Sequence, residues 1–155
     1  MKIYLPDLEA TLALGRLIGE QCSEGQVFAV LGDLGAGKTS LAQGVAAGLG
    51  VGQDSYVNSP TFTLHQRHQG RLRFNHIDLY RLDSTEELLN RGLRELVGLD
   101  GVSYNECPSR APDFLPPDTV WLRLGVYDEG RIVSFGHSSA TSKQYIESVC
   151  NLARK

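Results

Sequence analysis

Apolar and polar residues along this chain alternate between two arrangements, one typical of strands and the other typical of helices. An apolar run predicts a buried strand over residues 26–31, and the apolar positions of residues 41–49 recur at helical spacing. Apolar positions of residues 8–18 also share one helical face, in a helix expected to begin at Pro6-Asp7 and to close at Gly25. The first third of the chain therefore predicts a helix, a strand and a second helix.

The middle of the chain favours strands joined by tight turns. Pro60 excludes a helix at that point, and the alternation of Phe62 and Leu64 predicts a strand. Gln69-Gly70 lies between two extended runs, as the turn of a hairpin does, and the returning strand is expected over residues 72–78. This region therefore predicts a loop followed by a hairpin.

Helix and strand signals continue to the end of the chain. Ser84 and Glu87 have the spacing of a capping box and predict the start of a helix. A short strand is expected over residues 102–106, followed by an irregular loop that prolines keep out of regular structure. Alternating apolar residues predict a hairpin over residues 120–136, and Ser142 is expected to cap a last helix.

Composition and charge limit the classes of protein to which the chain can belong. The formal net charge of −3 gives no global electrostatic reason to bind nucleic acid or an anionic membrane, so any such contact must be local. No apolar stretch approaches the roughly 18 residues of a membrane span, and the start lacks the apolar core of a signal peptide. We expect a cytoplasmic protein that makes no membrane contact. Its three cysteines lack Cys-x-x-Cys spacing and are expected to be reduced thiols.

The strongest chemical signal is the segment Gly-Asp-Leu-Gly-Ala-Gly-Lys-Thr at residues 32–39, directly after the first predicted strand. It satisfies the phosphate-loop pattern Gly-x-x-x-x-Gly-Lys-[Ser/Thr], in which glycines let backbone N–H groups surround a phosphate at a helix N-terminus. Lys38 is expected to reach the β- and γ-phosphates, and the Thr39 hydroxyl to ligate Mg²⁺. The segment therefore predicts a site for a nucleoside triphosphate.

The order of strand, phosphate loop and helix also predicts the fold class. We expect an α/β protein, a P-loop NTPase three-layer sandwich around a mostly parallel sheet. The hairpin over residues 120–136 should add antiparallel strands at an edge. With 155 residues, of which 41% are hydrophobic, the chain is long enough for one well-buried core. We therefore expect residues 1–155 to form a single domain.

Two carboxylates follow predicted strands and are candidates for the catalytic chemistry. A phosphate loop alone only binds, whereas hydrolysis also needs a carboxylate near Mg²⁺ and a group that orients the attacking water. Asp78 ends the strand 72–78, and Glu106 ends the strand 102–106. Both can lie at the sheet edge where such groups act, and the alternative for each is a solvated acid at a strand end.

Three motifs occur in the order that characterises one known family. They are the phosphate loop, Ser59-Pro60-Thr61-Phe62-Thr63-Leu64 and His76-Ile77-Asp78-Leu79-Tyr80-Arg81-Leu82. Together they resemble the TsaE (YjeE) family, the ATPase component of the bacterial machinery that makes threonylcarbamoyladenosine on tRNAs reading codons that begin with A. The resemblance runs from about Thr11 to Leu124 and so covers most of the chain.

The resemblance implies a Mg²⁺-dependent ATPase, slow alone, that acts on a complex of the proteins TsaD and TsaB and meets tRNA through that complex. The catalytic residues would be Asp78, Glu106 and Lys38. Asp78 would polarise or position the attacking water, directly or through Mg²⁺, Glu106 would ligate Mg²⁺ or activate water, and Lys38 would hold the phosphates. Thr61 would face the γ-phosphate from a switch-like loop, and Thr11 would lie near the nucleotide. The remaining contacts to ATP or ADP would come from Gly35, Ala36, Gly37, Lys38, Thr39 and Ser40.

One departure from the family pattern leaves other functions open. Relatives usually read Ile-Glu-Trp-x-Glu at the end of the strand 102–106, whereas this chain has Cys107 in place of the aromatic residue and Ser109 in place of the second acid. A cysteine cannot supply the area with which an indole stacks on a base. The alternatives are a nucleotide-dependent protein-binding module with incidental hydrolysis and a small P-loop kinase.

Basic and histidine residues near the predicted hairpin give weaker signals. Arg67, Arg71 and Arg73 form either a local patch for tRNA phosphates or a solvated strand face. The pair His65 and His68 lacks further residues that would complete a metal site, so surface histidines are expected. His76 can orient the Asp78 carboxylate, contact phosphate or pack within the fold.

Overall fold

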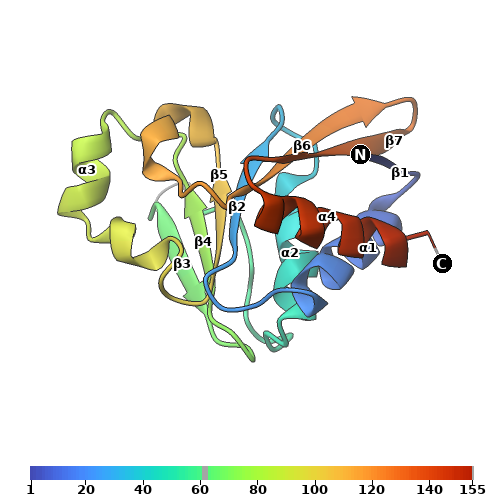
Figure 1. Ribbon diagram of the computed structural model, residues 1–155, viewed down its shortest axis with the longest axis horizontal. Helices are drawn as coiled ribbons and strands as arrows, with labels where there is room; N and C mark the ends of the chain where they lie inside the picture. The colour runs from blue at the N-terminus through green and yellow to red at the C-terminus, as the bar shows by residue number, and fades with distance from the viewer. Residues whose placement is uncertain (61–62, 155) are drawn as a thin grey trace.

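The computed structural model describes residues 1–60 and 63–154, and within them the strands form one seven-stranded sheet in the order β1-β7-β6-β2-β5-β4-β3 (Figure 1). The helices are α1 (Leu8–Glu20), α2 (Lys38–Gly48), α3 (Thr85–Asn90) and α4 (Ala140–Leu152), with short 3₁₀ helices η1 (Leu93–Leu96), η2 (Pro108–Arg110) and η3 (Pro112–Phe114). The strands are β1 (Lys2–Leu5), β2 (Val27–Leu31), β3 (His65–His68), β4 (Phe74–Asp78), β5 (Val102–Glu106), β6 (Val120–Tyr127) and β7 (Gly130–His137).

The centre of the sheet is parallel and its margins are antiparallel. β2 pairs in parallel with β6 on one side and with β5 on the other, and β5 pairs in parallel with β4. The pairings β1·β7, β7·β6 and β4·β3 are antiparallel. The predicted α/β fold with added antiparallel strands is thereby confirmed. The late hairpin is not the edge, however, because β6 joins the parallel centre and β1 lies outside β7.

Helices cover both faces of the sheet, which gives the three layers that the sequence predicts (Figure 1). Apolar residues of α1, α2 and α4 pack against one face in a cluster that includes Phe28 and Val30 of β2. On the other face, residues of α3 and the 3₁₀ helices form a second cluster with Val27 and Ile77. Within residues 1–60 and 63–154, no helix combines the length and the apolar character that crossing a bilayer requires.

Several local predictions differ from the structure at the ends of elements. Strand β1 is not expected from the sequence, and α1 ends at Glu20 instead of Gly25. Leu8 is exposed, since the buried face of α1 begins at Thr11. The strand expected from Phe62 begins only at His65; Phe62 itself lies outside the described residues. The cap of α4 is Ser139, and Ser142 is its partner three residues later in a capping box.

Helices α1 and α2 approach each other through glycines, which brings the phosphate-loop helix close to the N-terminal helix. A Cβ atom at Gly15 of α1 would lie 2.6 Å from the carbonyl oxygen of Leu41 and 2.8 Å from the Cα of Gly44. Both neighbours are backbone atoms of α2 and cannot rotate away. Only residues without a side chain permit this contact.

We expect Gly15→Ala to lower the free energy of unfolding by about 2 kcal/mol, the scale of overpacking a close contact. Helix propensity alone predicts the opposite sign, a gain of about 1 kcal/mol for alanine over glycine. Urea denaturation followed by circular dichroism measures the change. Gly52→Ala is the control, because a Cβ there meets no atom within 4 Å. Equal stability of the two variants would contradict a tight α1–α2 contact.

Candidate functional site

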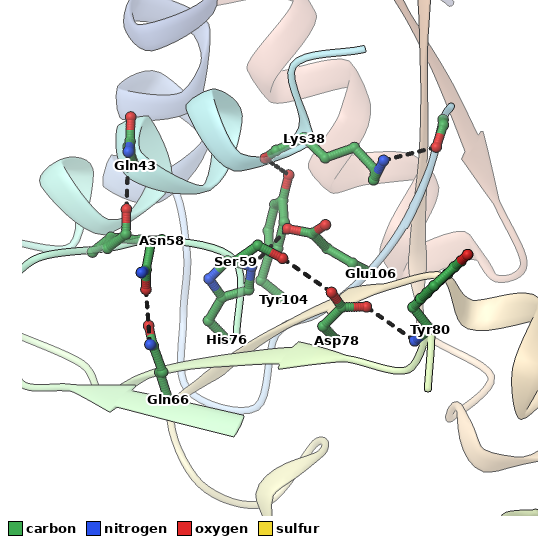
Figure 2. Close-up of polar contacts among 12 residues, drawn as sticks. Lys38, Gln43, Asn58, Ser59, Gln66, His76, Asp78, Tyr80, Tyr104 and Glu106 are labelled. Carbon is green, nitrogen blue, oxygen red and sulfur yellow. Dashed lines mark hydrogen bonds and ion pairs between the residues drawn. The ribbon is translucent and has the colours of Figure 1, made fainter. Parts of the chain in front are cut away.

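The phosphate-loop segment connects β2 to α2 in a conformation that depends on glycine. Gly35 and Gly37 have φ angles of 79° and 102°, and Gly37 is the N-cap of α2. Residues that carry a side chain rarely adopt such backbone angles, so the glycines let the loop fold tightly ahead of the helix. The Lys38 ammonium group donates to the carbonyl oxygens of Gly32 at 2.8 Å and Asp33 at 3.0 Å, as Figure 2 shows for one of them. The Lys38 side chain therefore folds back along the loop, while its backbone begins helix α2.

Tyr104 of β5 anchors the first turn of α2 to the sheet. Its hydroxyl donates to the Lys38 carbonyl oxygen at 2.7 Å (Figure 2), and its side chain is fully buried. Burial, followed by the negative charge of Glu106, raises the pKa of Tyr104 well above its ordinary value. The phenol therefore keeps the proton that it donates.

Tyr104→Phe is expected to lower the free energy of unfolding by about 1 to 2 kcal/mol, because the substitution removes the hydroxyl and leaves the partly buried Lys38 carbonyl without that donor. Thermal and urea denaturation measure the loss. Tyr127→Phe is the matched control, since Tyr127 is exposed on β6 and removal of its hydroxyl should change stability by less than about 0.5 kcal/mol. A Tyr104→Phe protein as stable as the control would contradict the anchoring role.

The two predicted carboxylates lie side by side because their strands are parallel and in register. Asp78 of β4 is the pairing partner of Glu106 of β5, and both residues are buried. Asp78 accepts from the Ser59 hydroxyl through Oδ2 and from the backbone N–H of Tyr80 through Oδ1, each at 3.0 Å (Figure 2). The structure thus brings together two acids that are 28 positions apart in the sequence.

A cavity of about 730 Å³ joins these acids to the glycine-rich loop. Oxygen atoms supply most of its polar groups: the carboxylates of Asp33, Asp78 and Glu106, the Thr39, Ser40 and Ser59 hydroxyls, and the loop backbone. Such a donor set suits Mg²⁺, which prefers oxygen ligands and shares them with phosphates. Its lining residues are Gly32, Asp33, Leu34, Gly35, Gly37, Lys38, Thr39, Ser40, Ser59, Asp78, Tyr80, Glu106 and Cys107.

Thr11 lies at a second, smaller cavity that shares the same loop. This cavity of about 250 Å³ is bounded by Gly35, Gly37 and Ser40 and by the β6–β7 turn, but not by Asp78 or Glu106. Thr11 itself is buried and donates through its hydroxyl to the Asp7 carbonyl oxygen at 3.1 Å. The loop therefore separates Thr11 from the acids, with one cavity on each side.

The segment before Thr61 is held to three elements, although Thr61 and Phe62 lie outside the described residues. Gln43 of α2 donates to the Val57 carbonyl oxygen at 2.9 Å, and Gln66 of β3 donates to the Asn58 side-chain oxygen at 2.8 Å (Figure 2). Ser59 then meets Asp78. These tethers were not evident from the sequence, since the residues share no motif and only the fold brings them together.

His76 does not contact the Asp78 carboxylate. Its Nε2 lies 2.7 Å from Oε1 of Glu106, and both side chains are buried (Figure 2). The reason is strand geometry: neighbouring positions on β4 and β5 pair His76 with Tyr104 and Asp78 with Glu106, so His76 is diagonal to Glu106 on the same face.

Cys107 turns the chain directly after β5. It is half-buried, lines the larger cavity and has a left-handed φ of 56°. Burial raises the pKa of the Cys107 thiol, and the neighbouring Asp78 charge raises it further. The thiol is therefore uncharged at neutral pH and gives the cavity a small apolar wall.

The arginine and histidine residues that gave the weaker sequence signals make contacts within the fold. Arg73 and Arg67 pair with Asp100 at 2.8 and 3.5 Å, and Arg71 donates to carbonyl oxygens at the end of α1. The three arginines therefore do not form a free basic patch. His65 is half-buried and bonded to Asn75, and no group of three His, Cys, Asp or Glu side chains suited to a metal occurs in the described part of the chain.

A strand that leads through such a loop into a helix, within a parallel sheet covered on both faces, is the arrangement of a P-loop NTPase fold. The crystal structure of Bacillus subtilis YdiB has the same architecture, with a TM-score of 0.84 and 27% identity over 98% of this chain and 95% of that one. The family model described as threonylcarbamoyl adenosine biosynthesis protein TsaE matches residues 5–133. The chain belongs to the TsaE family.

Curated relatives are similar over most of their length. The tRNA threonylcarbamoyladenosine biosynthesis protein TsaE of Treponema pallidum is 39% identical over 84% of this chain and 95% of its own. The protein of that name from Nostoc is 39% identical over 83% and 80%, and that from Haemophilus influenzae is 31% identical over 96% of both chains. The three motifs therefore indicated the correct family.

Proposed function

We propose that this protein binds ATP with Mg²⁺ and hydrolyses it as an accessory step in threonylcarbamoyladenosine modification of tRNA. It acts on the TsaD–TsaB complex, and tRNA is met through that complex. The observation that carries the proposal is the larger cavity, in which Lys38 and Thr39 share one space with Asp78 and Glu106. Hydrolysis needs a carboxylate near Mg²⁺ and a group that orients the attacking water, and the two buried acids can supply both.

The two cavities on either side of the loop suggest how the nucleotide lies. The phosphates run over Gly35 to Ser40, with the γ-phosphate on the side of the acids and the remainder of the nucleotide on the side of Thr11. Lys38 leaves its contacts with the loop carbonyls and donates to phosphate oxygens. The backbone N–H groups at the start of α2 supply further donors.

Asp78 and Glu106 have separate tasks in this proposal. Asp78 receives hydrogen bonds through both oxygens and is held as a fixed acceptor that orients the attacking water. Glu106, with Thr39, faces the Mg²⁺ position. When bound, Mg²⁺ neutralises charge on the phosphate oxygens that would otherwise repel the water. Slow turnover by the chain alone follows, because nothing in the described cavity supplies a second cation beside Lys38.

In this proposal, the segment that contacts Asp78 makes binding of the partner proteins depend on whether ATP or ADP is bound. Ser59 donates to Asp78 and lies next to tethers from α2 and β3, so a γ-phosphate oxygen that competes with Asp78 for the Ser59 hydroxyl alters this segment. The TsaD–TsaB complex binds the ATP and ADP arrangements with different affinities, which is the requirement for any nucleotide-driven cycle.

Mg²⁺-dependent ATP turnover tests the proposal when measured on the purified chain alone, with TsaD–TsaB, and with TsaD–TsaB and tRNA. Stimulation by the partners supports the ATPase cycle. ATP that binds and orders a complex without being turned over favours the second candidate, a nucleotide-dependent protein-binding module. Cys107 is the specific feature that favours this second candidate, because it replaces the aromatic residue usual in relatives.

A further inference from the structure

His76 and Glu106 form a short contact between two titratable side chains of neighbouring strands, and it is closed to solvent. Nε2 and Oε1 are 2.7 Å apart, and neither side chain exposes more than 4% of its surface. His76 also packs edge-on against the Tyr104 ring, with a centroid distance of 5.4 Å, and beside Phe74. The imidazole is therefore fixed by rings on two sides and by one hydrogen bond.

The hydrogen-bond partners of His76 decide which nitrogen carries the proton. Nδ1 is buried and has no partner in the described residues. A charged imidazolium would bury an N–H group there without an acceptor, whereas a neutral ring with its proton on Nε2 leaves only a lone pair unpaired. Nε2 is therefore the nitrogen through which the ring donates to the Glu106 carboxylate.

We propose that His76 is a positioning residue that fixes the Glu106 carboxylate for nucleotide and Mg²⁺, an inference that rests on the proposed ATPase function. The bond occupies Oε1 and leaves Oε2 as the oxygen that Glu106 presents to the cavity. It also restricts the rotation of the carboxylate, so that the group does not need to be ordered when the nucleotide arrives. Side chains that orient ligand carboxylates in this way commonly determine activity without touching the reacting atoms.

The contact with Tyr104 extends the effect to the other side of the cavity. Tyr104 supports the His76 ring and donates to the Lys38 carbonyl oxygen, so one buried cluster fixes both Glu106 and the first turn of α2. Glu106 and Lys38 are thereby held relative to each other by side chains that lie beneath the site. With its ring held against Tyr104, His76 is hydrogen-bonded to Glu106 of the neighbouring strand β5 and not to Asp78, two positions further along its own strand.

Two variants separate positioning from packing. His76→Phe keeps a ring against Phe74 and Tyr104 but removes the donor, whereas His76→Gln keeps an N–H donor and loses the ring. We expect His76→Phe to reduce kcat for ATP with TsaD–TsaB by about tenfold or more, with KM changed less than about threefold. His76→Gln should recover most of kcat. In a Glu106→Gln background, His76→Phe should have no further effect on kcat, and additive losses would overturn the proposal.

Nitrogen NMR of histidine-labelled protein gives a readout that does not depend on turnover, and the spectrum of the native protein does not depend on the folding of a variant. The His76 ring, one of four in the chain, should show a protonated Nε2 and an unprotonated Nδ1 in the native protein, with a shift of Nε2 in Glu106→Gln. A proton on Nδ1, or an Nε2 signal insensitive to Glu106→Gln, would overturn the proposal. If native protein binds MgATP without turnover, the proposed hydrolysis fails, and this spectrum still decides whether His76 holds Glu106.

Discussion

Lys38→Ala is expected to lower Mg²⁺-dependent ATP turnover by about 10²- to 10³-fold, the scale of removing one donor aimed at developing negative charge. Lys38 is the cation of the glycine-rich loop, and in the structure its ammonium group is held within 3.0 Å of two loop carbonyls. In the proposed mechanism, phosphate oxygens replace those carbonyls as the partners of Lys38. Loss of the charge weakens binding of the γ-phosphate more than binding of ADP, and calorimetric titration with both nucleotides measures that difference.

The same substitution should abolish threonylcarbamoyladenosine formation in a reconstituted system with TsaD, TsaB and tRNA. Lys143→Ala is the matched control, because Lys143 is an exposed lysine on α4 whose partner Glu147 is 3.9 Å away. The control removes the same charge from the chain at a distance from the loop. Full modification of tRNA by the Lys38→Ala protein would contradict the proposed function.

The phosphate loop and the central strands could be predicted because their signals are local. The loop follows a continuously apolar strand and precedes a helix with apolar residues at helical spacing, and all three features need only neighbouring residues. Strand β1 has no such local signal. It has only four residues, of which one is buried, and they are ordered by pairing with β7, more than 120 positions away. Long-range pairing of a short edge strand therefore escapes a local pattern.

Some residues of the candidate site could likewise be predicted from the sequence, and others could not. Asp78 and Glu106 could be placed at strand ends from the sequence, and parallel pairing then brings them together. The hydrogen-bond partner of His76 could not be predicted, because it depends on the register between β4 and β5. A shift of one residue would turn Glu106 to the opposite face and away from His76. Tyr104 was missed for a similar reason, since an apolar strand pattern does not reveal that its hydroxyl reaches the start of α2.

Glu106→Gln is expected to retain ATP binding and to lose turnover by about 10²- to 10³-fold, within the range for removing a group that acts on the transferred proton or charge. The amide has almost the same shape, and its oxygen can still accept the bond from His76 Nε2. The substitution therefore removes the negative charge while it leaves the local geometry in place. Single-turnover assays with TsaD–TsaB, together with calorimetric affinities for ATP, separate the chemical step from binding.

The effect on the partner complex distinguishes a cycling ATPase from a binding module. A protein that needs hydrolysis to be released should bind TsaD–TsaB in the presence of ATP and remain bound when Glu106 is replaced, so that modification stops after the first round. A pure binding module should tolerate the change. Glu147→Gln on the exposed face of α4 removes an equal charge and serves as the control. Normal turnover and normal modification by the Glu106→Gln protein would exclude Glu106 from catalysis and leave Asp78 as the candidate for that role.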